Sequence, residues 1–166
     1  MNRVVITGMG AITPLGNDVA SFWDGLKNGK NGIDFITKFD TKDIDVHVAA
    51  EVKGFDPTLY MDRKEAKRMD LFCQYGIAAA LQAVEHSGIT QENTDFDRFG
   101  VIVSSGIGGL PTMEQQIIKL HDKGPTRVAP LFVPMTIGNM IAGNISMKTG
   151  ARGICTSIVT ACASGT

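Results

Sequence analysis

The stretch Asp70-Leu-Phe-Cys-Gln-Tyr-Gly-Ile-Ala-Ala-Ala-Leu-Gln-Ala-Val-Glu-His-Ser87 decides how this chain folds. Its polar residues recur along a single line at a spacing of four, through Ala78: Asp70, Gln74, Gln82 and His86. Nearly every other side chain in the stretch is apolar or small, and a helix with so narrow a polar stripe is buried around most of its circumference. The pattern therefore predicts a core helix over 70–87, ended by Gly88, with a layer of structure on each side.

Short runs of β-branched residues on either side of this helix predict strands. The runs 3–7, 99–104 and 154–160 are rich in valine and isoleucine, which is typical of strands covered on both faces of a sheet. Segment 46–52 alternates between valine or alanine and other residues, so it is expected to be a half-buried strand.

Further helices are predicted between the strands, over 18–29, 110–123 and 136–149. Asn17 or Asp18 can cap the first, and Pro111 suits the first turn of the second. Both carry an apolar face that is expected to pack on the core. Thr136 can cap the third.

The third predicted helix contains Gly138 and Gly143, each of which costs about 1 kcal/mol relative to alanine. We therefore expect both glycines to pack closely against another backbone. Strands that alternate with helices indicate an α/β fold with a largely parallel, covered sheet. No linker is evident, so residues 1–166 are expected to form one domain.

The composition of the 166 residues excludes several classes of protein. Lysine plus arginine number 16 and aspartate plus glutamate 17, so a net charge of −1 gives no drive toward nucleic acid. The apolar stretches are far shorter than the ~20 residues that span a bilayer, and the first residues lack the features of a signal peptide. We expect a cytoplasmic protein with no nucleic-acid partner and no membrane segment.

The cysteines, histidines and paired glycines point to no metal and no resident cofactor. The three cysteines are odd in number without a Cys-x-x-Cys pair, and the three histidines share no metal-ligand spacing. Gly8-Met-Gly10 and Gly106-Ile-Gly108 each follow a predicted strand, but Thr13 and Pro111 stand where a dinucleotide-binding fingerprint needs glycine or alanine. These glycines are expected to form strand-exit turns or to allow close backbone approach.

The segment Thr160-Ala-Cys-Ala-Ser-Gly165 places a reactive residue directly after a predicted strand, between small side chains. A tight turn that presents a nucleophile has these requirements. If a helix begins at Cys162, its free amides favour the thiolate and can stabilise an oxyanion. The alternative is a buried, inert cysteine, which is also the expected state of Cys73 and Cys155.

A basic stretch precedes the core helix and contains Arg63, Lys64, Lys67 and Arg68. One interpretation is a solvated helix start whose charges pair internally with nearby carboxylates. The other is a local patch for an acidic partner or a phosphate.

Taken together, several segments resemble the N-terminal part of the β-ketoacyl-[acyl-carrier-protein] synthases, most closely the type II elongating enzymes. The similarity runs along the whole chain. It is carried by residues 4–16 (VVITGMGAITPLG), 61–70 (MDRKEAKRMD), 104–109 (SSGIGG), 132–143 (FVPMTIGNMIAG) and 160–165 (TACASG).

The resemblance implies a thiolase-like fold, layered α/β/α/β/α, of which the chain covers the N-terminal half. It also implies an acyltransferase of fatty-acid elongation that performs a decarboxylative Claisen condensation with malonyl-carrier protein. Cys162 would be the nucleophile that takes the acyl group from the phosphopantetheine of the acyl carrier protein, and its amide would be an oxyanion donor. No cofactor of the enzyme's own is implied.

Other roles follow from the same resemblance. Ile107 matches a position in the acyl pocket, and Phe132 and Val133 match residues that reach a pocket across a dimer interface. Lys64, Lys67 and Arg68 match a surface that docks the acyl carrier protein. Strand 154–160 would pair with its mate in a homodimer.

The family's two catalytic histidines and its lysine follow the nucleophile in the chain, and His47, His86 and His121 match none of them. The 166 residues are therefore expected to be a fragment, inactive in condensation by itself. Alternatives are a polyketide or other ketosynthase, or a non-catalytic piece that dimerises or docks the carrier.

Overall fold

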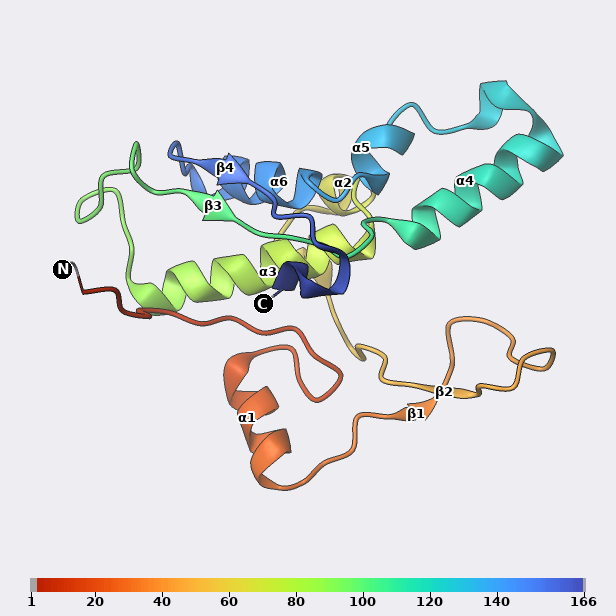
Figure 1. Ribbon diagram of the computed structural model, residues 1–166, viewed down its shortest axis with the longest axis horizontal. Helices are drawn as coiled ribbons and strands as arrows, with labels where there is room; N and C mark the ends of the chain where they lie inside the picture. The colour runs from red at the N-terminus through yellow and green to blue at the C-terminus, as the bar shows by residue number, and fades with distance from the viewer. Residues whose placement is uncertain (1–2, 166) are drawn as a thin grey trace.

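The long helix α3 (Leu71–Ser87) runs through the middle of the computed structural model, which describes residues 3–165 (Figure 1). Asp70 caps its start, and Gly88 ends it in a left-handed conformation with φ +67°, as the sequence predicts. Helix α6 (Met140–Thr149) packs on one side of α3, and the N-terminal segment lies against another part of its surface. The predicted helix and its limits are confirmed, but its burial is less complete than expected: the buried residues of α3 are Cys73, Gln74, Ile77 and Ala78.

The remaining elements are short. The helices are α1 (Val19–Lys27), α2 (Arg63–Ala66), α4 (Leu110–Lys123) and α5 (Phe132–Thr136), with 3-10 helices η1 (Pro57–Leu59), η2 (Pro125–Arg127) and η3 (Ala161–Gly165). The strands are β1 (Asp34–Phe35), β2 (Val48–Ala49), β3 (Val101–Ile102) and β4 (Cys155–Thr156).

The core lies where α3, α6 and β3 meet. Its buried side chains include Cys73 and Ile77 from α3, Ile141 and Ile145 from α6, and Val101 from β3. Burial of such side chains stabilises a fold by about 1.5–3 kcal/mol each. This cluster therefore fixes α3 against the strands.

The polar stripe of α3 faces inward over part of its length. Asp70 and Gln74 are buried, and the Gln74 amide donates to the carbonyls of Ala66 and Met69. The Gln82 amide donates to the Asn17 carbonyl and the Tyr60 hydroxyl. Buried polar groups persist only when they are hydrogen-bonded, so the stripe ties α3 to its neighbours.

Strands β3 and β4 form the parallel pair that the α/β prediction requires, with Val101 opposite Cys155 and Ile102 opposite Thr156. The prediction that both faces are covered is wrong for the described residues. Successive side chains point to opposite faces of a strand, and only one face meets α6. Val101 is therefore 5% exposed whereas Ile102 is 63% exposed, and Cys155, expected in the core, is exposed.

The predicted strand 3–7 is also wrong. Within the described residues this segment pairs with no strand, and its side chains are exposed. It continues instead into an extended segment that packs on α3 (Figure 1). A Cβ on Gly10 would collide with the Ala79 carbonyl, which confirms that these glycines allow close backbone approach.

The predicted strand 46–52 shrinks to β2, which pairs antiparallel with β1 to form an arm (Figure 1). Lys53 Nζ lies 2.7 Å from Asp34 Oδ2 and joins the ends of this arm. The arm is solvated on both sides, because β1 is exposed and β2 is at most half-buried.

The predicted helix 136–149 begins later than expected, because α6 starts at Met140 and Thr136 is the last residue of the separate helix α5. Thr136 ends α5 rather than capping α6, because its hydroxyl donates to the carbonyls of Phe132 and Val133 in the preceding turn. No atom outside its own helix comes within 4 Å of a Cβ placed on Gly143, so the predicted close packing is wrong there.

The expected packing of the apolar faces of α1 and α4 is only partly found. Val19 and Phe22 on α1 and Met113 on α4 are half-buried. Trp23 and Leu26 on α1, and Ile117 and Leu120 on α4, are exposed.

Candidate active site at the exit of β4

The chain turns sharply after β4 and presents Cys162 in η3. Ala161 has φ +51°, a left-handed conformation that is uncommon for residues other than glycine. Small neighbours make so tight a turn possible, and the Cys162 side chain is exposed. The exposure that a presented thiol requires is therefore found, and burial of Cys162 is excluded for this structure, whereas its role as a nucleophile stays a prediction.

The main-chain amide of Cys162 has no hydrogen-bond acceptor among the described residues. Around it, the Ala163 amide donates to the Thr160 carbonyl over 3.2 Å, and the Thr160 amide donates to Ser164 Oγ over 2.8 Å. Across residues 3–165, no acceptor receives the Cys162 amide. A free amide beside a nucleophile is the arrangement that stabilises an oxyanion.

The loop 104–109 lies between this turn and α5. At its start, Ser104 Oγ accepts the Ile158 amide over 2.9 Å, and Gly106 packs against the Ala161 carbonyl. At its end, the Gly109 amide donates to the Thr136 carbonyl of α5 over 2.9 Å. The loop therefore contacts both the turn that carries Cys162 and the end of α5.

The predicted pocket residues lie on these segments. Ile107 is exposed in the middle of the loop, and Phe132 (half-buried) and Val133 (exposed) lie in the first turn of α5. Gly108 has φ +97°, and a Cβ there would collide with the Thr136 carbonyl. Glycine is thus required for the loop to approach α5.

Sequence reasoning missed the residues that shape the loop. Ser105 Oγ accepts the Gly108 amide over 2.9 Å, and Asp70, identified only in the polar stripe of the core helix, reaches the start of α4. A pair of serines between a buried strand and a Gly-x-Gly turn is a local signal that would have singled out the serines. Nothing local signals the second contact of Asp70.

The basic segment, residues 63–68, consists of α2 and the two residues that follow it. Asp62 and Glu65 form a capping box at its start, and Glu65 also lies 2.8 Å from Lys148 of α6. Hydrogen bonds from Lys148 and from the Asp62 amide hold the pKa of Glu65 below its usual value. The nearby carboxylates are thus engaged elsewhere.

The cations of this segment are exposed: Lys64, Lys67 and Arg68. Within the described part of the chain, no carboxylate lies within 4.0 Å of their charged groups, or of Arg63. The charge of Arg68 still acts on Asp62 and that of Arg63 on Asp56, so only close ion pairing is wrong for these four side chains, and the docking role stays a prediction.

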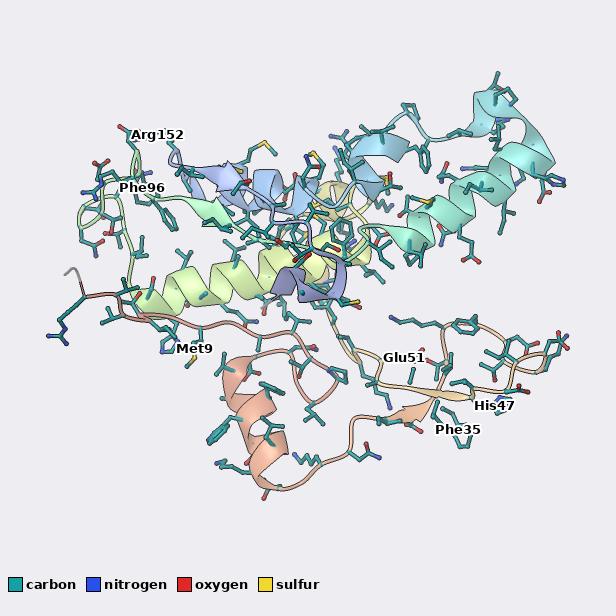
Figure 2. All side chains as sticks on the ribbon, viewed as in Figure 1. Met9, Phe35, His47, Glu51, Phe96 and Arg152 are labelled. Carbon is teal, nitrogen blue, oxygen red and sulfur yellow. The ribbon has the colours of Figure 1, made fainter. Side chains whose placement is uncertain are left out.

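The other candidate groups are engaged singly. Over residues 3–165 there is no group of three histidine, cysteine or acidic side chains that could hold a metal ion. The ring of His86 accepts the Met9 amide, and His47 contacts Thr41 on the β1–β2 arm, well separated from η3 (Figure 2). His121 contacts Asp122. No described helix is long and apolar enough to cross a membrane.

Comparison with known proteins gives concordant results. Residues 1–166 match the family described as "Beta-ketoacyl synthase, N-terminal domain". The chain is 50% identical over 164 residues to the 3-oxoacyl-[acyl-carrier-protein] synthase 2 of Staphylococcus aureus (strain N315), covering 99% of this chain and 40% of the relative. It is 47% identical over 163 residues to the protein of the same name from Synechocystis sp. (strain ATCC 27184 / PCC 6803 / Kazusa), covering 98% and 39%.

Among solved structures, the ishigamide ketosynthase/chain length factor superposes with a TM-score of 0.82 at 26% identity, covering 94% of this chain and 39% of that one. This likeness confirms the predicted ketosynthase fold. The chain spans about two fifths of the length of the relatives that it matches. It belongs to the β-ketoacyl synthase family, whose N-terminal domain it matches from its first residue to its last.

Proposed function

We propose that the complete protein is a β-ketoacyl-[acyl-carrier-protein] synthase that elongates fatty-acyl chains through a thioester on Cys162. The observation that carries this proposal is the exposed Cys162 thiol after the left-handed Ala161, beside its own amide, which has no acceptor within residues 3–165. The identity of 50% to a 3-oxoacyl-[acyl-carrier-protein] synthase 2, against 26% to the ishigamide ketosynthase, favours fatty-acid chemistry over the polyketide alternative.

The first step is acyl transfer to Cys162. Its thiolate attacks the carbonyl carbon of an acyl thioester on the carrier's phosphopantetheine, and a new carbon–sulfur bond forms. The carrier's carbon–sulfur bond breaks, and the pantetheine sulfur leaves as a thiolate that takes up a proton. The Cys162 amide donates to the oxyanion of the tetrahedral intermediate, a contribution that is typically worth 10²–10³ in rate.

The second step is condensation. Malonyl-carrier protein loses its carboxylate as carbon dioxide, and the electron pair of the broken carbon–carbon bond remains as an enolate. Its carbon attacks the carbonyl of the Cys162 thioester and forms the new carbon–carbon bond. The Cys162 thiolate leaves, which regenerates the nucleophile and releases a 3-oxoacyl chain on the carrier.

The basic surface of Lys64, Lys67 and Arg68 is the proposed docking site for the acyl carrier protein. These cations are exposed, and among the described residues none of them has a carboxylate within 4.0 Å. Acidic side chains of a carrier could therefore form ion pairs with them. Electrostatic complementarity of this kind raises the association rate and fixes orientation. The carrier also appears in the names of the relatives from Staphylococcus aureus and Synechocystis.

The acyl chain is proposed to extend from Cys162 along the loop 104–109. Ile107 lies in that loop and is exposed. By the resemblance, Phe132 and Val133, which begin α5, would reach the corresponding pocket of a second copy across a dimer interface. Apolar side chains at these positions suit an alkyl chain, which is held mainly by burial of apolar surface.

The proposal also covers the oligomeric state, the cofactor requirement and the cellular location of the protein. The exposed Ile154 and Val159 beside β4 suit pairing of this edge with a second copy in a homodimer. The reaction draws its acyl groups from the carrier and needs no cofactor resident in the protein. A nucleophilic thiol must stay reduced, which fits the cytoplasm.

The test measures condensation by the complete protein supplied with acyl- and malonyl-carrier protein. We expect a 3-oxoacyl product two carbons longer than the donor, and its loss in Cys162→Ala. Cys155→Ala is the matched control, because Cys155 is also exposed, and it should retain activity. Full condensation by Cys162→Ala would refute the proposal.

A further inference from the structure

Asp70 carries a buried carboxylate that the chemistry above does not use. It is 6% exposed and is the charged member of the buried polar residues within 3–165. A buried charge is costly unless hydrogen bonds compensate it. The hydrogen bonds that compensate the Asp70 carboxylate therefore indicate its structural role.

The carboxylate of Asp70 caps two helices at once. One oxygen, Oδ1, accepts the Phe72 amide of α3 over 3.2 Å. The other, Oδ2, accepts both the amide of Thr112 over 3.0 Å and its hydroxyl over 2.6 Å. Thr112 lies in the first turn of α4, whose own cap, Gly109, has no side chain to offer. A carboxylate is favoured at each helix start by free amides and by the helix dipole.

This second contact fixes the end of the loop 104–109. A Cβ on Gly109 would lie 3.0 Å from Asp70 Cβ and 2.5 Å from the Met135 carbonyl, so the loop ends packed between α3 and α5. Its start is held by Ser104, which accepts the Ile158 amide. The path of the loop, and so the place of Ile107, depends on the Asp70–Thr112 contact at one end and on the β4 exit at the other.

We infer that Asp70 is a positioning residue which sets the acyl-chain preference of Cys162 by fixing the loop 104–109 through Thr112. The inference rests on the proposed function. It assigns the buried carboxylate no contact with substrate; Asp70 acts through the loop that carries Ile107. Misplacement of a binding group by about 1 Å can cost about a hundredfold in rate, so a small shift of the loop suffices.

The test compares rates of Cys162 acylation in the complete protein with short-chain and long-chain acyl-carrier donors. Asp70→Asn keeps an oxygen to cap α3, since asparagine is an equally good cap, but its amide nitrogen cannot accept the donors of Thr112. We expect the ratio of the two rates to change by about tenfold. The rate of Cys162 alkylation by iodoacetamide, which needs no acyl pocket, should stay within about twofold of the unmodified protein.

Two further variants separate positioning from general stability. Thr112→Val removes the hydroxyl but keeps the amide and the shape, and it should change the ratio in the same direction. Thr112→Ser restores a hydroxyl and should restore the ratio. If Asp70→Asn does not fold, the ratio of acylation rates in Thr112→Val and Thr112→Ser tests the inference.

Two outcomes would overturn the inference and are distinguishable. Equal slowing with both donors, or an unchanged ratio in both Asp70→Asn and Thr112→Val, makes the contact merely structural and leaves the proposed function intact. Failure of the unmodified protein to acylate Cys162 overturns the proposed function and the inference with it.

Discussion

Cys73 and Cys162 are the same side chain in two opposite settings. Cys73 lies in α3, packed in the core, with its sulfur 3.2 Å from the Asn144 amide nitrogen. Cys162 lies in η3 beyond β4, exposed beside a free amide. The comparison shows that position in the fold decides which of these two thiols is exposed, and the exposed one is the proposed nucleophile. The core element α3 supplies the rigidity against which the loop and the turn are placed.

The most direct way to break the comparison is to measure the reactivity of the two thiols. Burial raises the pKa of Cys73, and the nearby Asp70 charge raises it further, so less thiolate is present at any given pH. Its alkylation also requires local opening of the core. We expect iodoacetamide to modify Cys162 about a thousandfold faster than Cys73 at pH 8, measured by peptide mass spectrometry over time. The two alkylation rates should become equal only in denaturant. Equal rates under native conditions would contradict the proposal that Cys162 is the reactive thiol.

A second test concerns the stability of the core that holds α3. Ile77 of α3 is fully buried in the core cluster, and its replacement by alanine should lower the free energy of unfolding by about 2–5 kcal/mol. Leu59→Ala, at an exposed site, should change it by less than about 0.5 kcal/mol. Chemical denaturation of the complete protein checks both. Similar losses in the free energy of unfolding at the two sites would contradict the assignment of Ile77 to the core.

A third test sharpens the other side of the comparison, the turn itself. The left-handed Ala161 is strained, by about 1–2 kcal/mol for an L-residue. Ala161→Gly should keep acylation of Cys162 within about threefold, since glycine adopts this conformation freely. Ala161→Val should slow it about tenfold, because a β-branched residue resists positive φ. If Ala161→Val were acylated as fast as Ala161→Gly, the left-handed conformation at residue 161 would not be needed to present Cys162.

The smallest expected effect concerns how α2 is tied to α6. Because Lys148 lowers the pKa of Glu65, the pair contributes stability above the ordinary glutamate value of 4.5 and loses it as the pH falls through the lowered value. Lys148→Met should reduce the free energy of unfolding at pH 7 by less than about 1 kcal/mol, and the difference should shrink as the pH falls below 4.5. Lys67→Met, at an exposed unpaired cation, is the matched control. A difference that grows in acid would contradict this assignment.

Local signals in the sequence were sufficient for α3. The Asp70 cap, the left-handed Gly88 and the apolar surface all act within a few residues, so the helix and its limits could be predicted. The turn at Cys162 could also be predicted, because small neighbours and a preceding strand are local features. Family resemblance added predicted roles for Ile107 and for the basic segment, which no spacing reveals and which stay predictions.

The burial of the strands could not be predicted. An apolar run such as 154–160 indicates a strand, but which of its faces is covered depends on elements distant in the chain. Among the described residues α6 covers one face only, so Ile154 is exposed. The reach of Asp70 to Thr112, 42 residues away, was equally hidden, since a capping pattern shows only the first helix that a carboxylate serves.

The measurement that tests the central claim most directly is the location of the acyl group after the complete protein meets an acyl-carrier donor. The protein would be digested, and the mass of each cysteine-containing peptide measured. We predict one acyl group, on the peptide of Cys162, with the peptides of Cys73 and Cys155 unmodified. An acyl group on Cys155 in place of Cys162, or none on any cysteine, would contradict the claim that the exit of β4 presents the nucleophile.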